Sequence, residues 1–164
     1  MRLKKEVEVV LNKQLELEFD AAVVYYGMYI YFEQELFKGF AAWFKHQAGE
    51  ERSHAGKIVQ YMLERGAAPG VPATKAPKTT YASPLDAMKS ALAHEQANTA
   101  GIHACLKAAA KADDPATIEM LQWFVKEQVE EEQWADEYVQ MVQKVQSSVG
   151  GMYAFDHAVG KRVK

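Results

Sequence analysis

The middle of the chain reads AAPGVPATKAPKTTYAS at residues 67–83. Three of the five prolines fall inside this stretch, and a fourth, Pro84, follows it directly. Proline removes a backbone donor and clashes with the preceding turn of a helix, so a helix does not continue through such a stretch. We therefore expect an extended connection of about 17 residues, which can reach roughly 55 Å.

Long helices are expected on both sides of this connection, because apolar residues recur there at helical spacing. Gly66 is typical of the position after a helix end, and Ser83 and Asp114 each precede a proline as N-cap residues do. Gly150 and Gly151 should separate the last two helices. No stretch alternates as a half-buried strand would, so the class is all-α. The expected helices are at about 3–35, 39–66, 84–111, 115–149 and 152–160.

The lengths of the connections predict the topology. The first and third are short, so each should join two antiparallel neighbours. A helix of 28 residues is about 42 Å long, so the connection at 67–83 can cross the whole bundle. The third helix would then run parallel to the second. We expect residues 1–164 to form a single domain, a four-helix bundle with one long crossover and a short C-terminal fifth helix.

The composition is that of an ordinary globular protein, with 49% hydrophobic and 25% charged residues. A net charge of −3 gives no indication of a nucleic-acid partner or an anionic membrane surface. The longest apolar run, residues 21–32, is too short to span a bilayer. A single cysteine, Cys105, and the lack of an apolar leader segment near the N terminus predict a cytoplasmic location.

The same run, AAVVYYGMYIYF at residues 21–32, is apolar or aromatic on every face of a helix. A helix at the surface of a bundle needs only one apolar stripe. We expect the remaining apolar faces to lie in an interface with other copies of the chain. A helix buried entirely within a monomer is the alternative.

Each long helix carries a potential metal ligand near its middle. Two of the helices carry a pair of such residues three positions apart, which places both members on one face. The candidates are Glu18 on the first helix, Glu51 and His54 on the second, Glu95 on the third, and Gln128 and Glu131 on the fourth.

The spacing of these candidates predicts that they share one layer. Residues equidistant from the turn of an antiparallel hairpin lie level, and the midpoint of Glu18 and Glu51 falls beside the first turn. The midpoint of Glu95 and Gln128 falls beside the third turn in the same way. A parallel crossover also brings Glu51 level with Glu95. All four helices therefore contribute to one level of the bundle.

Carboxylates buried in such a layer are costly, by several kcal/mol each, unless they are paired or bound to a cation. A pair of divalent cations would remove that cost. Oxygen-rich donors with a single imidazole and no thiolate favour iron or manganese over structural zinc. The pattern thus predicts a di-metal centre.

Four motifs carry a resemblance to a known family. They are LNKQxxxE at 11–18, EERSHA at 50–55, HEQ at 94–96 and LQWFVKEQVEEE at 121–132. These motifs resemble the helix signatures of bacterial and archaeal non-haem ferritins. The tail GMYAFD at residues 151–156 extends the similarity over nearly the whole chain. The resemblance implies a ferroxidase that oxidises Fe(II) with dioxygen and stores the ferric product inside a homo-oligomeric cage of about 24 subunits.

The resemblance also implies residue roles. By position, Glu18, Glu51 and His54 would bind the first iron, and Glu95 and Gln128 the second. Further expected residues are Tyr25, beside the centre, and Glu50, Glu127, Glu130 and Glu131, at a third iron site.

Two departures distinguish this chain from relatives of the same fold. Arg52 stands where bacterioferritins carry their haem methionine, so no haem is expected, and one cysteine cannot build a rubredoxin-like domain. Two other functions stay open at this point. One is a di-metal oxygenase or ribonucleotide reductase subunit on the same bundle, and the other is a non-catalytic helical interaction protein.

Overall fold

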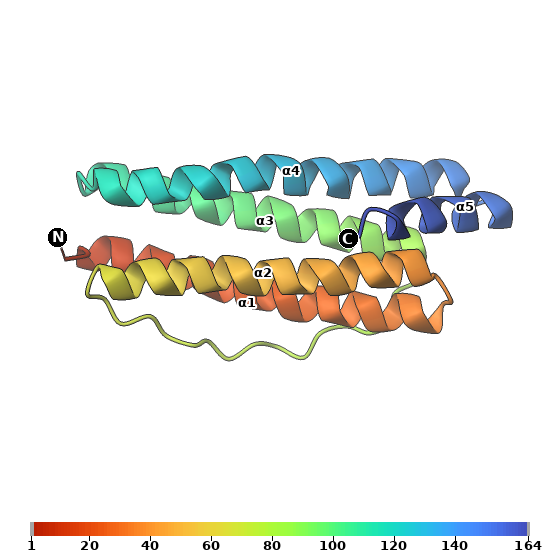
Figure 1. Cartoon of the computed structure of the whole chain (residues 1–164), viewed down its shortest axis with the longest axis horizontal. Coiled ribbons are helices and arrows are strands. Elements are labelled where there is room, and N and C mark those ends of the chain that lie inside the picture. Colours follow the sequence, from red (N-terminus) through yellow and green to blue (C-terminus); the bar gives the residue numbers. More distant parts are fainter. Residues whose placement is uncertain (1, 164) are drawn as a thin grey trace.

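The computed structural model describes residues 2–163, and its regular elements within that range are all helices. Two hairpins, α1–α2 and α3–α4, pack side by side, and α5 lies across one end of the bundle (Figure 1). This confirms the predicted all-α class and the bundle with a short fifth helix. None of these helices, within residues 2–163, is both long and apolar enough to cross a membrane. The helices are α1 (Lys5–Gln34), α2 (Lys38–Glu64), α3 (Pro84–Lys111), α4 (Pro115–Val145) and α5 (Val149–Gly160).

A residue with positive φ follows each of the first three helices. Gly66, with φ of 66°, takes this position after α2, as its sequence context predicts. Leu36 (φ 63°) and Asp113 (φ 49°) do so after α1 and α3 without being glycine. In each case the next backbone N–H bonds back to the last helical turn, as Phe37 N does to Phe32 O at 3.0 Å. After α1 and α3 these motifs keep the connections short and the hairpins tight, whereas after α2 the motif begins the long crossover.

The predicted N-caps are present at two helices. The side chains of Ser83 and Asp114 accept hydrogen bonds from the backbone N–H groups of Asp86 and Thr117, each at 3.2 Å. Each cap satisfies a donor that the first helical turn leaves without an intrahelical partner.

The boundary between the last two helices differs from the prediction. α4 ends at Val145 rather than near Val149, and α5 begins at Val149 rather than near Met152. The side chain of Ser148 accepts a hydrogen bond from Gly151 N at 3.1 Å and so caps α5. The two glycines expected to break the helix instead lie in the first turn of α5, because this cap offsets their low helix propensity.

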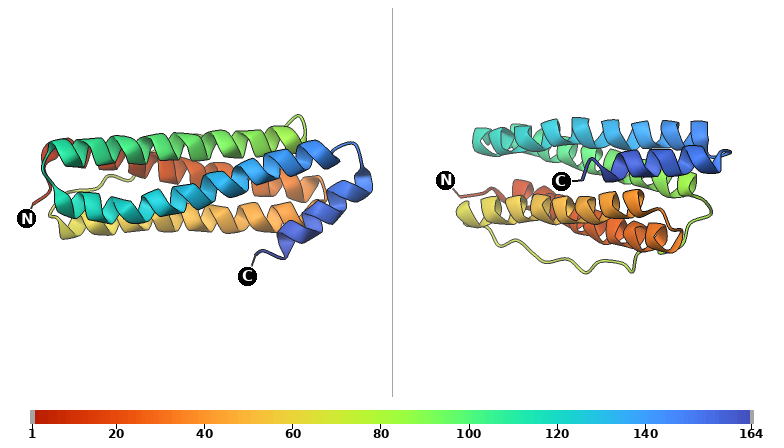
Figure 2. Two further views of the ribbon diagram at one scale, coloured as in Figure 1. Left: turned by 90° about the horizontal axis from the view of Figure 1, so that it is seen from above. Right: turned by 45° about the vertical axis from the view of Figure 1, so that its right-hand side comes forward.

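The crossover between α2 and α3 runs along the outside of the bundle beside α1 (Figures 1 and 2). The backbone N–H of Gly70 donates to Asn12 Oδ1 at 2.9 Å, which fixes the early part of the crossover. Farther along, a Cβ atom at Gly27 would overlap the carbonyl oxygen of Lys78. The crossover therefore lies directly on α1 and delivers α3 parallel to α2, as predicted. It also covers part of the apolar surface of α1 that we expected other subunits to cover.

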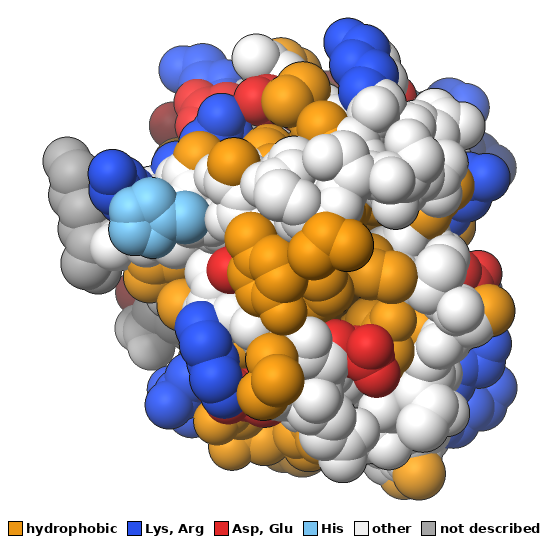
Figure 3. Space-filling model, turned by 90° about the vertical axis from the view of Figure 1, so that its right-hand side faces the viewer, with side chains coloured by type: hydrophobic (Ala, Val, Ile, Leu, Met, Phe, Trp, Pro, Cys, Tyr) orange, Lys and Arg blue, Asp and Glu red, His pale blue; other side chains and the backbone are white. Residues whose placement is uncertain are grey.

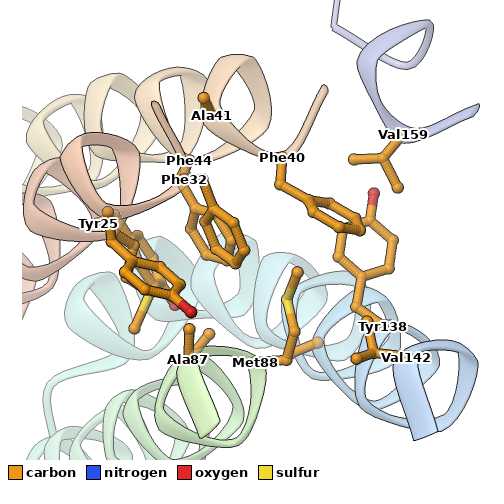
Figure 4. Close-up of a cluster of buried hydrophobic side chains, with 14 of the residues drawn as sticks. Tyr25, Phe32, Phe40, Ala41, Phe44, Ala87, Met88, Tyr138, Val142 and Val159 are labelled. Atoms are coloured by element: carbon orange, nitrogen blue, oxygen red, sulfur yellow. The ribbon is translucent and has the colours of Figure 1, made fainter. Parts of the chain in front are cut away.

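The core consists of two apolar clusters at different heights. The larger one lies toward the α5 end and is rich in aromatic side chains, such as the parallel rings of Phe32 and Phe44 with centroids 5.4 Å apart (Figure 4). The other lies toward the N terminus and contains Leu15, Ala55 and Phe124. The level of the predicted ligands falls between these two clusters.

Helix α5 is attached to the start of α2. The carboxylate of Asp156 accepts hydrogen bonds from Gly39 N at 3.1 Å and from Phe40 N at 2.7 Å, which are free donors of the first turn of α2. A Cβ atom at Gly160 would lie 2.9 Å from the Cα atom of Gly39, so the two helices touch through glycines. The outer surface at this end of the molecule carries exposed apolar side chains (Figure 3), including Leu36, Val149 and Tyr153.

Candidate metal centre

The predicted ligands meet inside the bundle. Glu18, Glu51 and Glu95 are fully buried at 0% exposure, and His54 and Gln128 are exposed by only 2% and 4%. Buried apolar residues that precede and follow these positions on the same helices form the two core clusters. The register inferred from the hairpin midpoints therefore brings side chains from all four long helices into one buried layer.

The first group of potential ligands consists of Glu18, Glu51 and His54, whose ligand atoms all lie within 4.8 Å of one another. His54 Nδ1 lies 3.5 Å from Glu51 Oε2 and 3.7 Å from Glu18 Oε2. These separations are too long for good hydrogen bonds but leave room for an ion between the atoms.

Several polar atoms of this group lack hydrogen-bond partners in the described part of the chain. They are both carboxylate oxygens of Glu51, Oε2 of Glu18 and both ring nitrogens of His54. Buried polar atoms without a partner are rare in proteins because each costs its full desolvation penalty. A divalent cation would supply the missing partner to all of these atoms, so the residues present fit a metal ion.

The second group consists of Glu51, Glu95 and Glu131, again with ligand atoms within 4.8 Å of one another. Gln128 Nε2 donates to Glu95 Oε2 at 3.2 Å, and the indole N–H of Trp134 donates to Glu131 Oε2. Glu51 belongs to this group and to the first one. A carboxylate shared in this way can bridge two cations.

Tyr25 lies at the edge of the second group. Its hydroxyl donates a hydrogen bond to Glu95 Oε1, and its ring packs against those of Phe44 and Trp134, with centroids at 5.7 and 6.2 Å. Burial, together with the charges of Glu95 and Glu51, raises the pKa of Tyr25 well above its usual value. Tyr25 is therefore a neutral phenol, the predicted tyrosine beside the centre.

Three groups of the layer, Glu51, Glu95 and His54, bind protons more tightly than usual in the metal-free protein. Burial raises the pKa of Glu51 well above its usual value, and burial together with the charge of Glu131 raises the pKa of Glu95 to about 8. Burial lowers the pKa of His54, but the neighbouring carboxylates of Glu18 and Glu51 outweigh it and raise that pKa to about 10. A cation that binds here must displace these protons.

The structure assembles only part of the expected third site. Glu127 and Glu131 lie together with His54, with ligand atoms within 4.8 Å. The side chain of Glu50 is 46% exposed and lies beside His46 rather than in a cluster. Glu130 is exposed and belongs to none of the clusters formed by residues 2–163. It follows Gln128 by two residues, which turns it about 200° around the helix from the buried face.

Two glutamines near the centre were not singled out from the sequence. Gln14 Nε2 donates to Glu18 Oε1 at 2.7 Å, and Gln47 Nε2 donates to Glu131 Oε2 at 2.8 Å. A signal for both was present, because each glutamine lies four residues before a candidate ligand, Glu18 or Glu51, and so shares its helical face.

The side of the centre that holds Gln128 borders a surface cavity. This cavity of about 300 Å³ lies between α3 and α4. Gln128 forms part of its lining, next to Thr99 and Val129, with His103 and Glu132 also on its walls. The half of the centre that contains Glu95 is therefore separated from this cavity by a single neutral side chain.

Fold and site together define a four-helix-bundle protein with a buried, carboxylate-rich candidate metal centre. Residues 9–145 match the family model described as "Ferritin-like domain". The chain is 35% identical over 160 residues to a bacterial non-heme ferritin of Staphylococcus aureus (strain USA300), covering 98% of this chain and 96% of the relative. A bacterial non-heme ferritin of Staphylococcus epidermidis is 34% identical over the same length. The chain belongs to the ferritin family.

Solved structures agree with this assignment. The open pore ferritin of the hyperthermophilic archaeon Archaeoglobus fulgidus superposes with a TM-score of 0.93 at 32% sequence identity. The match covers 96% of this chain and 98% of the archaeal one. The resemblance to bacterial and archaeal non-haem ferritins inferred from the four motifs is thus confirmed.

Proposed function

We propose that the protein is an iron-storage ferroxidase, which oxidises Fe(II) with dioxygen at the buried centre. One observation carries this proposal. Glu51 is fully buried, both of its oxygens lack hydrogen-bond partners among the described residues, and it belongs to two adjoining ligand groups. A side chain in that situation fits the bridge between two ferrous ions.

The two ligand groups support a division of roles. Glu18, Glu51 and His54 would bind one Fe(II). Glu51 and Glu95 of the second group, with the adjacent Gln128, would bind the other. Carboxylate oxygens stabilise Fe(III) more than Fe(II), because the harder and more highly charged ion gains more from them. The centre therefore favours the loss of one electron from each ion to dioxygen. Gln128 would add an uncharged metal ligand, and the lower total ligand charge favours release of the ferric product.

A third iron position is supported on the side of α2 and α4. Glu127 and Glu131 provide two carboxylates near His54. Glu131 is also a member of the second group, so an ion bound there would share a ligand with the oxidation site. Glu50 and Glu130 belong to this position only if their side chains rotate on iron binding.

The surface of the hairpin α1–α2 supports assembly into a homo-oligomer. A cavity of about 560 Å³ lies there, next to Tyr26, whose side chain is 50% exposed. Exposed apolar patches of this kind mark interfaces. By resemblance to the family we propose a cage of about 24 subunits, located in the cytoplasm.

Arg52 lines the same cavity and offers no thioether, so we propose that no haem binds there. Besides Tyr26, the apolar residues that line this cavity are Phe19, Ala22, Val23, Ala48 and Pro77.

The decisive experiment is aerobic oxidation of Fe(II), followed by absorbance, in Glu51→Ala and His54→Ala. Both variants should lose most of the rapid oxidation, because each removes a ligand of the first ion. Glu16→Ala is the matched control, since Glu16 is an exposed acid on α1 outside the centre. Wild-type rates in both ligand variants would refute the proposal.

The mass of the assembly in solution separates storage from a di-metal enzyme on the same bundle. Light scattering after size exclusion should give a particle of many subunits that retains iron after oxidation. A monomer or dimer that turns over without retaining iron would instead indicate an oxygenase-type enzyme.

A further inference from the structure

Gln14 is a polar side chain in the interior of α1 that contacts the centre without belonging to it. It is only 1% exposed, and its Nε2 donates a hydrogen bond to Glu18 Oε1 at 2.7 Å. Only the NH₂ end of the amide can donate to a carboxylate, so this contact fixes the orientation of the amide. The other end, Oε1, has no hydrogen-bond partner within residues 2–163. A buried acceptor without a partner is unfavourable, so the position of the Gln14 side chain must be favoured by a different interaction.

The position of Gln14 depends on a glycine in α3. A Cβ atom at Gly101 would overlap Oε1 of Gln14 and lie 2.8 Å from Cδ1 of Leu17. Glycine in the interior of a helix lowers helix stability relative to alanine. Gly101 is thus locally unfavourable, yet it is what leaves room for the amide of Gln14.

The contact with Gln14 makes the two oxygens of Glu18 unequal. Oε1 accepts the hydrogen bond from Gln14. Oε2 has no hydrogen-bond partner in the described chain and lies 3.7 Å from His54 Nδ1. One oxygen is therefore engaged by Gln14, and the other has no partner and lies near His54.

We propose that Gln14 is a positioning residue that presents Glu18 to the first Fe(II) through one oxygen, Oε2, and that Gly101 provides the space this requires. The hydrogen bond occupies one lone pair of Oε1 and holds the carboxylate in the orientation that directs Oε2 to the ion, which favours binding through that oxygen alone. One coordination position of the ion then stays open for dioxygen or water. This inference rests on the proposed function, because it assumes that Glu18 is an iron ligand.

The test uses Co(II) as a redox-stable substitute for Fe(II) and compares the intact wild-type oligomer with Gln14→Met. Methionine keeps the length of the side chain and removes the donor. We expect Co(II) to bind about 10- to 100-fold more weakly, as is typical when the hydrogen-bond partner of a ligand is removed. The visible absorption of bound Co(II) should also change, because Glu18 is then free to bind through both oxygens. A purely structural role would leave the spectrum of the bound ion unchanged.

Gly101→Ala provides an independent test with Gln14 intact. The atoms that the new methyl group meets belong to the ends of flexible side chains, so the amide should move while the fold persists. The Co(II) spectrum should shift as it does in Gln14→Met. The double variant should bind no more weakly than Gln14→Met, because both changes act through one contact. Gly56→Ala is the matched control, since a Cβ atom at Gly56 meets no atom within 4 Å.

The outcomes separate this inference from the proposed function. If wild type and Glu18→Ala bind Co(II) identically, Glu18 is not a ligand and the proposed site is wrong. If Glu18→Ala loses binding while Gln14→Met and Gly101→Ala keep wild-type affinity and spectrum, the site stands and the positioning role of Gln14 is wrong. Thermal unfolding of the metal-free variants checks their folding, and Gln14→Leu replaces Gln14→Met if the latter does not fold. A crystal soaked in Co(II) should show Glu18 bound through Oε2 alone in the wild type.

Discussion

The hydroxyl of Tyr25 on α1 donates a hydrogen bond to Glu95 on α3, which ties the two hairpins together at the level of the centre. Its ring also packs on Phe44 of α2 and Trp134 of α4, so the tyrosine contacts one residue on each of the other three long helices. The contact fixes one oxygen of Glu95, as Gln128 fixes the other. A single hydroxyl thus affects both the stability of the bundle and the geometry of the second ligand group.

Tyr25→Phe should separate these two effects. Loss of one buried hydrogen bond should lower the free energy of unfolding of the metal-free protein by about 1–2 kcal/mol, measured by chemical denaturation. Fe(II) should still bind, because no ligand is lost, but stopped-flow oxidation should be slower. Tyr153→Phe is the control, because Tyr153 is 46% exposed. Unchanged stability and rate in Tyr25→Phe would show that the hydroxyl has no such role.

The stability of the metal-free protein should fall as the pH rises from about 5 to about 8. Glu51 and Glu95 have raised pKa values when folded, so in this range the folded state binds more protons than the unfolded state. His54 acts in the same direction, because its pKa of about 10 exceeds the usual value of 6.5. Its contribution to stability is complete below pH 6.5 and is lost as the pH rises from there to about 10. Acids with lowered pKa values, such as Asp114, have already given their full contribution by pH 5.

Thermal unfolding in the presence of a chelator measures this dependence. With saturating Co(II) the trend should reverse, because the ion displaces the protons and binds more tightly as the pH rises. Binding at pH 7 should also release protons into a weakly buffered solution. A melting temperature of the metal-free protein that rises between pH 5 and pH 8 would contradict this account.

Asp156→Ala should weaken the attachment of α5. The variant loses both hydrogen bonds to the first turn of α2, which is equivalent to removing an N-cap and costs about 1–2 kcal/mol. Hydrogen exchange should then speed up in α5 and at the start of α2, while the residues around Glu51 stay protected. Asp136→Ala, at an exposed acid on α4, should leave exchange in α5 unchanged.

Gly27→Ala should be destabilising because of the crossover. The new methyl group would overlap the backbone oxygen of Lys78 and lie 2.9 Å from Cβ of Pro77, so the crossover must shift. We expect a loss of about 1–3 kcal/mol and faster proteolysis within residues 67–83. Gly56→Ala, also inside a helix but with open space around it, should instead raise stability by about 0.5–1 kcal/mol. Equal effects of the two substitutions would contradict close contact between crossover and helix.

The topology was predictable from the sequence because its determinants are local. The prolines around residues 67–83 exclude helix, and Ser83 and Asp114 mark helix starts through their own side chains. The level of the ligands followed from the lengths of the helices and connections alone. The end of α4 was not predictable in this way, because glycines and a capping serine compete there and the balance depends on how α5 packs against α2.

The candidate site was predictable at the level of helical faces but not of rotamers. The positions of Glu51 and His54 follow from their three-residue spacing. Whether Glu50 turns toward the centre or toward His46 depends on side-chain torsions that spacing does not determine. The role of Gln14 depends on a glycine in another helix, a relationship that appears only once α1 and α3 are packed together.

In the proposed di-iron centre, the membership of Glu51 in both ligand groups would link the two halves thermodynamically. An ion in either half would remove the proton from this carboxylate and fix its orientation, which would lower the cost of filling the other half. By linkage the effect is reciprocal, so the ions should load in pairs. Singly loaded subunits would then be rare, and electrons would leave two neighbouring ions together rather than one isolated ion.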